Sequence, residues 1–333
     1  MNSTADSSFP PVSIIIPNYN GALLMVQNLP VVRQALNAYA GGGELIVVDD
    51  CSRDGSVEVL ERQFSDVTLI RHDRNRGFSE AVHSGVHAAR HELLIFLNSD
   101  VQPEASFIAP LASALREDDV FAAAPLINRE TGACDPNSLN CYSIRGGRLR
   151  RLRGPYADAS LAKGPRPSLY ASGGSVALRR SRFLELGGFL PIFHPFYWED
   201  FDLGVRAWRR GWRIVSIPAS RIVHQSHGGA IKENVAKRRI RRALQRNKLL
   251  VEWIHLAPSE LPLFILRLIP RLLARAVSLD FGFVGALADA LAKLPEARSI
   301  RRKLEANGAK PFAQILQSIE AQNRRLFDAE NEV

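Results

Sequence analysis

The chain has 333 residues, of which 46% are hydrophobic and 23% are charged, and its formal net charge is +9. This length is enough for one large domain with an appendage or for two domains. No uninterrupted apolar run of about 20 residues occurs, which excludes a bilayer-spanning helix, and residues 1–11 lack the regions of a signal peptide. The three cysteines have no CxxC spacing, so a disulfide framework or thiolate metal site is not indicated. We expect a flexible N-terminus over residues 1–11 and a main folded part that stays in the cytoplasm.

The positive charge is concentrated in the C-terminal part of the chain. Residues 1–229 hold 24 Lys and Arg against 23 Asp and Glu, whereas residues 230–333 hold 19 against 11. This division predicts a nearly neutral domain over residues 12–229 and a basic region over residues 230–333 that meets an anionic partner. No stacking aromatic residues are interleaved with the basic ones, so nucleic acid is not the expected partner.

Short apolar runs rich in Val, Ile and Leu alternate with helical patterns in the first 125 residues. The expected strands are residues 12–16, 44–50, 67–72, 92–100 and 120–125. The stretches between them, such as "SVEVLERQF" and "SEAVHSGVHAARH", have the apolar spacing of amphipathic helices. Buried strands joined by helices indicate an α/β fold with a mostly parallel central sheet and helices on both of its faces.

Three polar segments follow strands of this sheet: "PNYNG" at 17–21, "DDCSRDGS" at 49–56 and "NSD" at 98–100. Each segment alone is equally well explained as a turn. The carboxyl ends of parallel strands share one edge, where ligands bind, and carboxylates that converge there repel one another unless a cation lies among them. The three segments together therefore predict a divalent metal bound with a phosphorylated ligand.

The polar segments belong to a longer series of motifs that resembles the inverting family-2 glycosyltransferases, in particular their rhamnosyltransferase-like branch. The stretches that carry the resemblance occur in the order of the family and are "VSIIIPNYNG", "ELIVVDDCSRDGS", "NRGFSEAVHSGVHAA", "LLIFLNSDV", "SGGSVALRRSRFLELGGF" and "WEDFDLGVRAWRRGWR". They cover residues 12–229. The resemblance implies the GT-A nucleotide-diphospho-sugar transferase fold, a divalent metal (Mg²⁺ or Mn²⁺) and a nucleoside-diphosphate sugar as donor.

The resemblance also implies which residues bind the donor. Pro17, Tyr19 and Asn20 would line the nucleotide site, with Tyr19 stacked on the base. Asp50 would accept the imide hydrogen of uracil or thymine, because an ionised carboxylate offers only acceptors, and Asp49 would be a neighbouring contact. The other residues that the resemblance assigns to the donor are Asn75, Gly77, Phe78, Asn98, Ser99, Gly173 and Gly174.

Asp100 and His224 are the metal ligands that the resemblance implies. Asp100 ends "NSD", which stands where the family has its Asp-x-Asp motif, so Asn98 replaces the first carboxylate. The metal thereby loses one anionic ligand and would be held largely by the diphosphate. A neutral imidazole can take the place of a carboxylate, and His224 lies at the family's position for such a ligand, with His227 as a competing candidate.

The segment "FYWEDFD" contains Glu199, Asp200 and Asp202 at the start of a helix, although a helix start needs at most one carboxylate as a cap. By resemblance, Asp200 is the general base that deprotonates the acceptor hydroxyl. Glu199 would hold the acceptor or the loop, and Trp198 would form a wall on which an acceptor sugar stacks. We expect Asp202 to be a helix-start charge that complements the macrodipole.

Two further features receive weaker interpretations. Residues 127–168 are rich in Gly, Pro and Arg and are predicted to form a mobile loop, whose basic cluster is either solvated or a site for an anionic acceptor. His83, which stands where the family usually has Asn, is interpreted as a partly buried polar group of a helix.

The basic region contains "ELPLFILRLIPRLLARAV", in which Arg267, Arg271 and Arg275 recur every four residues among Leu, Ile and Phe. A helix of this composition suits a membrane interface, with apolar side chains at the acyl boundary and arginines at anionic headgroups. The alternative is a helix that packs on the catalytic domain or on a second subunit, which would make the protein a homo-oligomer. Residues 312–333 are predicted to form an amphipathic end helix.

These features together predict a metal-dependent, inverting glycosyltransferase at the inner face of the plasma membrane. It would transfer a sugar from dTDP-rhamnose or a UDP-hexose to a lipid-linked or surface-glycan acceptor. One alternative is a catalytically silent protein that binds sugar nucleotides, although Asp100 and Asp200 are both present. The other is a nucleotidyltransferase of related fold, which would normally have a Gly-rich basic phosphate loop where this chain has "PNYNG".

Overall fold

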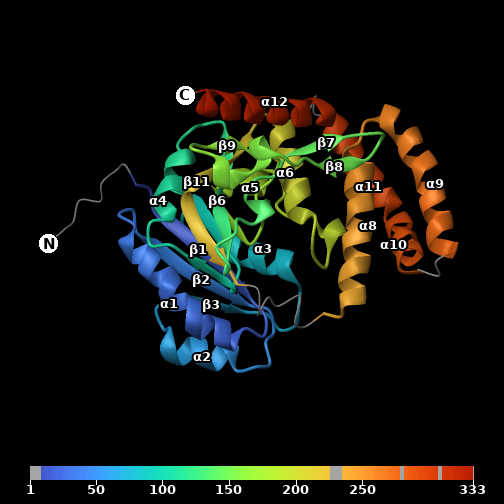
Figure 1. Ribbon diagram of the computed structural model, residues 1–333. Coiled ribbons are helices and arrows are strands. Elements are labelled where there is room, and N and C mark those ends of the chain that lie inside the picture. The colour runs from blue at the N-terminus through green and yellow to red at the C-terminus, as the bar shows by residue number, and fades with distance from the viewer. Residues whose placement is uncertain (1–8, 226–234, 278–280, 307–309, 333) are drawn as a thin grey trace.

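A mixed nine-stranded sheet forms the centre of the computed structural model, which describes residues 9–225, 235–277, 281–306 and 310–332 (Figure 1). The strand order is β3-β2-β1-β4-β10-β6-β11-β5, with β9 paired to β11. The strands are β1 (Val12–Asn18), β2 (Gly43–Asp49), β3 (Thr68–Arg71), β4 (Leu93–Leu97), β5 (Val101–Pro103), β6 (Val120–Arg129), β9 (Arg166–Pro167), β10 (Ser175–Arg179) and β11 (Arg213–His224).

The expected parallel arrangement holds for one half of the sheet. Strands β3, β2, β1 and β4 are parallel to one another. Strand β10 then runs antiparallel to both β4 and β6, while β11 returns to the parallel direction beside β6. The α/β fold class is therefore confirmed, and β10 is the strand that reverses direction near the centre of the sheet.

Helices cover both faces of the sheet. The helices α1 (Ala22–Ala38), α2 (Ser56–Gln63) and α4 (Ile108–Ala114) pack on one face, and α3 (Phe78–Ala88), α5 (Arg180–Glu185) and α6 (Glu199–Arg209) on the other. Successive side chains of a strand point to opposite faces. Accordingly, Ile14 and Ile16 are buried with the first group, and Ile15 is buried with the second.

The segment 127–168, which we expected to be a mobile loop, is an ordered part of the fold. It contains a hairpin of β7 (Tyr142–Ile144) and β8 (Leu149–Arg151). Leu139, Cys141 and Leu149 are buried in the same apolar core as the sheet. The prediction was wrong because the Gly, Pro and Arg composition concealed these few apolar side chains, which have their partners elsewhere in the chain.

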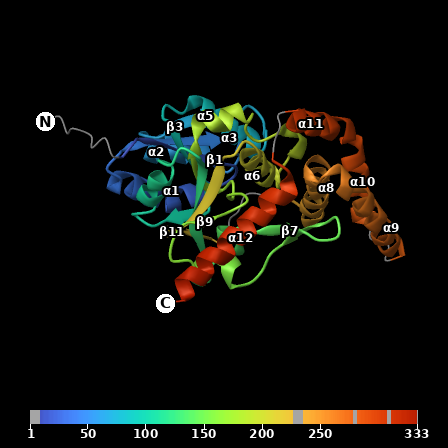
Figure 2. The same cartoon turned by 90° about the horizontal axis from the view of Figure 1, so that it is seen from above.

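The C-terminal region is helical, as predicted. Its helices are α8 (Lys237–His255), α9 (Leu261–Val277), α10 (Phe281–Ala292), α11 (Leu294–Ala306) and α12 (Phe312–Asn331). Leu250 of α8 and Phe312 of α12 share one buried cluster with Phe96 of the sheet. Helix α12 lies across the part of the molecule that contains β7 and β9, while α9 lies at the outer edge of the molecule in both views (Figures 1 and 2).

The predicted division at residues 229 and 230 falls within residues 226–234, which lie outside the described part of the chain, as do residues 1–8 of the expected N-terminal tail. The boundary therefore stays a prediction. Because the described C-terminal helices share a core with the sheet, we expect the two regions to fold together rather than as independent units.

Candidate active site

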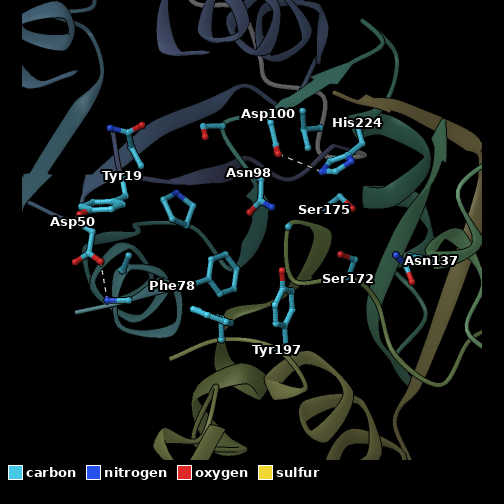
Figure 3. Close-up of a pocket in the computed structure, with 18 of the residues that line it drawn as sticks. Tyr19, Asp50, Phe78, Asn98, Asp100, Asn137, Ser172, Ser175, Tyr197 and His224 are labelled. Carbon is cyan, nitrogen blue, oxygen red and sulfur yellow. Dashed lines mark hydrogen bonds and ion pairs between the residues drawn. The ribbon is translucent and has the colours of Figure 1, made fainter. Parts of the chain in front are cut away.

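A cavity of about 860 Å³ opens at the carboxyl ends of β1, β2 and β4, where the sequence predicts a donor site. Tyr19 and Asp50 lie at one end of the cavity, and Asp100 and His224 lie at the other (Figure 3). The fold thus brings together most of the predicted donor and metal residues. Those that line the cavity are Pro17, Tyr19, Asp50, Asn75, Gly77, Phe78, Asn98, Ser99, Asp100, Gly174 and His224.

Asp50 fixes the turn that borders the cavity. Its Oδ1 accepts hydrogen bonds from the backbone N–H of Arg76 at 2.8 Å and lies 2.7 Å from Nδ1 of His72. Its Oδ2 accepts from the N–H of Gly77 at 2.7 Å. Gly77 has φ +87°, and a Cβ on it would lie 3.2 Å from the His194 ring, so this turn requires glycine.

Two residues at this end were not predicted from the sequence. His72, at the end of β3, connects Asp50 to α3, because its Nε2 lies 2.8 Å from Oγ of Ser84. Asn18 is 1% exposed and lines the cavity, and its Oδ1 has no hydrogen-bond partner in the described structure. A buried acceptor without a partner, on a residue that lines a cavity, is suited to a ligand with a hydroxyl or N–H donor. The position of Asn18 within "PNYNG" was the available signal.

Asp49 and Asn20 brace the cavity wall and are not among its lining residues. The carboxylate of Asp49 accepts from Asn18 Nδ2 and from the backbone N–H of Ser52, both at 2.9 Å. The side-chain oxygen of Asn20 accepts from the N–H of Arg53 at 2.9 Å. These contacts hold "PNYNG" against "DDCSRDGS", so the two residues shape the nucleotide end through their neighbours.

Sheet pairing brings Asp100 and His224 together although 123 residues separate them in the chain. Strand β5 pairs antiparallel with β11, with Val101 opposite His224, and the N–H of Gln225 donates to the Asp100 carbonyl at 2.9 Å. Nε2 of His224 lies 3.4 Å from Oδ2 of Asp100. Asp100 is 4% exposed, and its Oδ1 has no hydrogen-bond partner among the described residues.

This pair is chemically suited to a divalent metal. A buried carboxylate oxygen without a donor and an adjacent imidazole nitrogen are both good ligands for Mn²⁺ or Mg²⁺. Within the described ranges, no group of three His, Cys, Asp or Glu side chains converges as a complete metal site. The remaining coordination positions of the metal would therefore be filled by the diphosphate of a donor and by water. The competing candidate His227 lies outside the described residues.

Asn98 and the glycine pair form the floor between the two ends of the cavity. The N–H of Asn98 donates to the carbonyl of Gly174 at 2.8 Å. A Cβ on Gly174 would lie only 2.4 Å from Nδ2 of Asn98, and a Cβ on Gly173 would crowd the Phe78 ring at 3.3 Å. Gly174 therefore leaves no room for a side chain unless Asn98 moves, Gly173 is closely packed against Phe78, and of the two only Gly174 lines the cavity.

Asp200 stands directly behind this glycine pair. Its Oδ2 accepts from the N–H of Gly173 at 3.3 Å, and its Oδ1 accepts from the N–H of Phe201 at 2.7 Å. It is partly buried and does not itself line the cavity. Burial raises the pKa of the Asp200 carboxyl to about 6, although the hydrogen bonds from Gly173 and Phe201 act in the opposite direction.

Glu199 is more deeply buried than Asp200. It is 6% exposed, and its Oε2 has no hydrogen-bond partner in the described part of the chain. Burial, followed by the charge of Asp200, raises the pKa of Glu199 to about 8. The neighbouring carboxyls thus differ in protonation at neutral pH, with Glu199 mostly protonated and Asp200 mostly ionised.

Trp198 faces away from the donor cavity. Its backbone is left-handed, with φ 75°, and its ring centroid lies 5.2 Å from that of Phe201. It lines a second, smaller cavity of about 190 Å³ together with residues of α8, among them Gln245 and Lys248. Trp198, which we predicted to form a wall of the acceptor site, therefore lies against helix α8 of the C-terminal region.

Asp202 lies in the first turn of α6, where we expected a helix-start charge, and it is also a buried ion-pair partner. It is 0% exposed, and its Oδ2 accepts from Nε of Arg206 at 2.7 Å. Burial alone would raise the pKa of Asp202, but Arg206 and His255 more than offset this effect and hold it below the usual range. Arg206 is a local partner, four residues along the same helix, whereas His255 is 53 residues away and meets Asp202 only through folding, so the sequence did not indicate it.

Helix α8 also holds the loop that precedes Glu199. Asn247 is 0% exposed, and its Nδ2 lies 2.7 Å from the carbonyl of Phe193, 3.0 Å from that of Phe196 and 2.8 Å from that of Tyr197. Phe196 and Tyr197 line the donor cavity. The basic C-terminal region therefore forms part of the site's support.

The interpretation of His83 as a structural residue agrees with its contacts. Its Nε2 lies 3.1 Å from the backbone nitrogen of Phe189, and a Cβ on Gly188 would collide with its ring. Burial lowers the pKa of His83, which favours the neutral imidazole in this position.

Comparison with known proteins decides the family. The model described as Glycosyl transferase family 2 matches residues 13–186, which is more than half of the chain. The chain belongs to glycosyl transferase family 2. The family that the motifs predicted is thereby confirmed.

Curated relatives of this glycosyltransferase include a bacterial and a human enzyme. It is 28% identical over 203 residues to the N-acetylglucosaminyl-diphospho-decaprenol L-rhamnosyltransferase of Mycobacterium tuberculosis, in a match that covers 54% of the chain and 66% of the relative. It is 26% identical over 235 residues to human polypeptide N-acetylgalactosaminyltransferase 16, with 66% of the chain and 40% of that protein covered. The chain thus spans less than two thirds of either relative.

Solved structures show the same fold. GalNAc-T7 with UDP, GalNAc and Mn²⁺ has a TM-score of 0.59 at 17% identity, and covers 94% of this chain and 57% of its own. The mannosyltransferase PcManGT from Pyrobaculum calidifontis, in complex with GDP-Man and Mn²⁺, has a TM-score of 0.52 at 18% identity, with coverages of 97% and 87%. The GT-A fold of the family-2 glycosyltransferase is thereby confirmed.

Proposed function

We propose that this glycosyltransferase moves a sugar, with inversion at the anomeric carbon, from a nucleoside-diphosphate sugar to a hydroxyl of a lipid-linked glycan acceptor. The observation that carries the proposal is the arrangement of the main cavity. Tyr19 and Asp50 border one end, and the Asp100–His224 pair lies at the other, with the glycine pair and Asp200 behind it. A nucleoside at the first end and a diphosphate at the second would direct the donor sugar towards Asp200.

Asp200 is the general base in this proposal. Inverting transfer requires the acceptor oxygen to attack the anomeric carbon opposite the diphosphate, so the group that takes the hydroxyl proton must stand across the sugar. The raised pKa of Asp200, about 6, still leaves the carboxyl ionised at neutral pH and makes it a better proton acceptor than an exposed aspartate. Glu199, mostly neutral, then adds no second charge that would raise the pKa of Asp200 further.

Asp100 and His224 would hold the divalent metal, which supplies positive charge to the diphosphate of the bound donor. The orphaned Oδ1 of Asp100 and the 3.4 Å contact of its Oδ2 with His224 support this assignment. Two structural neighbours are complexes that contain Mn²⁺. Asn98, which lines the cavity without a charge, leaves the protein with one fewer anionic ligand than the Asp-x-Asp motif provides.

The leading donor is dTDP-rhamnose, followed by a UDP-hexose. The similarity to the L-rhamnosyltransferase of Mycobacterium tuberculosis supports the first. Stacking on Tyr19 suits either nucleoside, and the unpartnered Oδ1 of Asn18 provides an acceptor for a base or ribose donor. The carboxylate of Asp50 already accepts from Arg76 and Gly77, so we propose that it contacts the base only through its remaining lone pairs.

The acceptor is proposed to be lipid-linked and to approach from the side of Trp198 and Glu199. The rhamnosyltransferase relative is named for such a lipid-linked molecule, N-acetylglucosaminyl-diphospho-decaprenol. In this chain, Trp198 directly precedes Glu199 and Asp200 and lines the second cavity together with α8, where its ring offers an apolar surface to a sugar.

A peripheral position on an anionic membrane follows from helix α9. None of the helices in the described ranges is long and apolar enough to cross a bilayer. The outward face of α9 nevertheless exposes a row of large apolar side chains at helical spacing. Their exposed fractions are Leu266 63%, Ile269 51%, Leu273 63% and Val277 86%. Such a face, attached to a region with a net positive charge, suits the interface of anionic lipids.

A panel of nucleotide sugars tests the proposal. The full-length enzyme is incubated with dTDP-rhamnose, UDP-glucose, UDP-N-acetylglucosamine and GDP-mannose, with and without Mn²⁺, together with polyprenyl-diphosphate sugars. Metal-dependent transfer with an inverted anomeric configuration, read by NMR of the product, is the expected result. Binding of a sugar nucleotide without transfer or hydrolysis would favour the catalytically silent alternative, and release of pyrophosphate from a sugar phosphate and a nucleoside triphosphate would favour a nucleotidyltransferase.

A further inference from the structure

The charge balance of the donor cavity leaves one cation without a counter-ion. Two arginines line the cavity, Arg129 and Arg239. Nε of Arg129 lies 3.1 Å from Oδ2 of Asp135, which also lines the cavity, so the charge of Arg129 is already compensated. The guanidinium of Arg239 has no ion pair or hydrogen bond with any described residue, and the side chain is solvent-exposed at the cavity rim.

Arg239 belongs to a helix start that is unusually positive. Helix α8 begins after Ala236, which cannot cap the helix with its side chain, and the first turn contains no acidic residue. Instead, Lys237, Arg238 and Arg239 follow one another there. Cations at a helix N-terminus interact unfavourably with the helix macrodipole, and the first N–H groups of a helix have no partner within the helix. A bound anion would offset the positive charge and accept hydrogen bonds from these N–H groups.

The same cavity has two other unsatisfied polar atoms that point to a ligand. Oδ1 of Asp100 and Oδ1 of Asn18 belong to side chains that are 4% and 1% exposed, and neither has a hydrogen-bond partner among the described residues. Asp100 indicates a cation, and Asn18 indicates a hydroxyl or N–H group. A metal–nucleotide complex contains both a cation and hydroxyl or N–H groups. Its diphosphate also supplies an anion that can pair with the guanidinium of Arg239.

The backbone of α8 is held in place relative to the cavity. Asn247, two turns along the same helix, is fully buried against the carbonyls of Phe193, Phe196 and Tyr197. At the end of the helix, Nε2 of His255 lies 2.9 Å from Oδ1 of Asp202. Arg239 therefore extends from a fixed helix, which reduces the conformational entropy that binding must overcome.

We propose that Arg239 binds the diphosphate of the sugar donor and stabilises the nucleoside diphosphate as it departs. This inference rests on the proposed function. In the transfer, the acceptor oxygen forms a bond to the anomeric carbon while the bond from that carbon to the diphosphate oxygen breaks. The hydroxyl proton goes to Asp200, and the bonding electron pair leaves with the nucleoside diphosphate, whose negative charge increases by one. A guanidinium, which stays charged at all relevant pH values, is suited to this anion.

Isothermal titration of nucleotides in the presence of Mn²⁺ tests the assignment in the full-length protein. The probes are dTDP and UDP, which carry the diphosphate, and dTMP and UMP, which lack its second phosphate. Arg239→Ala should weaken binding of the better diphosphate by about 10-fold or more and change binding of the matching monophosphate by less than about 3-fold. Arg239→Lys should lie between wild type and Arg239→Ala, because it keeps the charge but loses the planar fork.

Arg238→Ala is the matched control, because Arg238 is in the same exposed turn and does not line the cavity. It should bind the nucleoside diphosphate within about 2-fold of wild type. Equal diphosphate affinity of wild type and Arg239→Ala would overturn the inference and leave the proposed function intact. Equal losses in Arg238→Ala and Arg239→Ala would also overturn it, since they indicate a general electrostatic effect. If the wild-type protein binds no nucleoside diphosphate with Mn²⁺, the proposed function itself fails and the inference fails with it.

Discussion

Nε2 of His255, in the last turn of α8, lies 2.9 Å from Oδ1 of Asp202, in the first turn of α6. Both side chains are essentially inaccessible to solvent, and Arg206 completes the buried group. This contact ties the C-terminal region to the helix that begins with Glu199 and Asp200. The proposed catalytic motif is therefore supported by residues on both sides of the predicted domain division.

Asp202→Asn should lower the free energy of unfolding by about 3–5 kcal/mol, because it leaves the buried Arg206 without an anion. His255→Ala should cost less, about 1–3 kcal/mol, since it removes one hydrogen bond and creates a small cavity. Urea unfolding measures both values. The surface variant Arg210→Ala, whose partner Glu185 is half exposed, is the control and should cost less than about 1 kcal/mol. A cost below 1 kcal/mol for Asp202→Asn would contradict the role of this buried group.

Asp200→Asn should reduce turnover by roughly 10²-fold or more while donor binding is retained, as expected for the loss of a general base. In the wild type, burial raises the pKa of Asp200 to about 6, and the base acts only when ionised. We therefore expect kcat/KM to fall as the pH drops through about 6. Initial rates across this range, with metal at saturation, measure the profile. Near-normal turnover of Asp200→Asn would remove the residue from the role of base.

Glu199 links protonation to stability. Burial and Asp200 raise the pKa of Glu199 from an ordinary value of 4.5 to about 8, so the folded state holds its proton more tightly than the unfolded state does. The stabilising contribution is complete below about 4.5 and is lost as the pH rises through about 8. Glu199→Gln keeps a neutral side chain at every pH. It should therefore lose less stability than wild type between these two values.

Thermal unfolding at a series of pH values tests this linkage. The exposed variant Glu58→Gln is the control, and its dependence on pH should match that of wild type. Parallel curves for wild type and Glu199→Gln would show that Glu199 is ionised in the folded protein over the whole range.

Asp100→Ala should abolish the metal-dependent part of donor binding, because the buried Oδ1 that faces the cavity is removed. His224→Ala keeps the carboxylate and should raise the Mn²⁺ concentration needed for half-maximal activity without abolishing it. Nucleotide titrations with and without Mn²⁺, and activity as a function of metal concentration, separate the two effects. Full activity of the wild-type enzyme in excess chelator would refute both assignments.

Replacing Leu266, Ile269 and Leu273 by Ser should weaken partitioning to anionic liposomes while nucleotide affinity stays unchanged. The three side chains are 51–63% exposed on the outward face of α9, away from the donor cavity. Each Lys or Arg near such a surface contributes about 1 kcal/mol and is screened by salt, so residual binding should be sensitive to ionic strength.

Substitution of Arg267, Arg271 and Arg275 by Glu tests the charged component of the same helix. It should reduce binding to anionic vesicles more than binding to neutral ones. Truncation near residue 256 should release the protein from anionic liposomes, although it also removes Phe283 and Phe312 from the core, so unfolding must be measured in parallel. Unchanged liposome binding of a folded variant would indicate that α9 packs against a second subunit instead.

Local sequence was sufficient to predict the family, strands β1, β2, β3, β4 and β6, and most of the predicted donor residues that line the main cavity. Tyr19, Asp50 and Asp100 directly follow strands whose apolar runs are continuous in the chain, and strand ends in a parallel sheet share one edge. The motifs around them have fixed spacing, because each turn is stabilised by nearby backbone groups such as the N–H of Ser52 on Asp49. Properties that depend on neighbours within a few residues can be predicted from the chain alone.

Only the tertiary structure decided the long-range partners. His224 meets Asp100 because β5 pairs with β11, Asp202 meets His255 because α8 packs against α6, and Asn247 reaches the loop before Glu199 in the same way. The hairpin within residues 127–168 is ordered by apolar contacts with distant helices. Burial and sheet pairing join residues that are far apart in the chain, and no local pattern specifies which of many compatible partners will be adjacent. For that reason, the raised pKa of Glu199 and the position of Arg239 at the cavity could be inferred only from the tertiary structure, which shows the neighbours of each side chain.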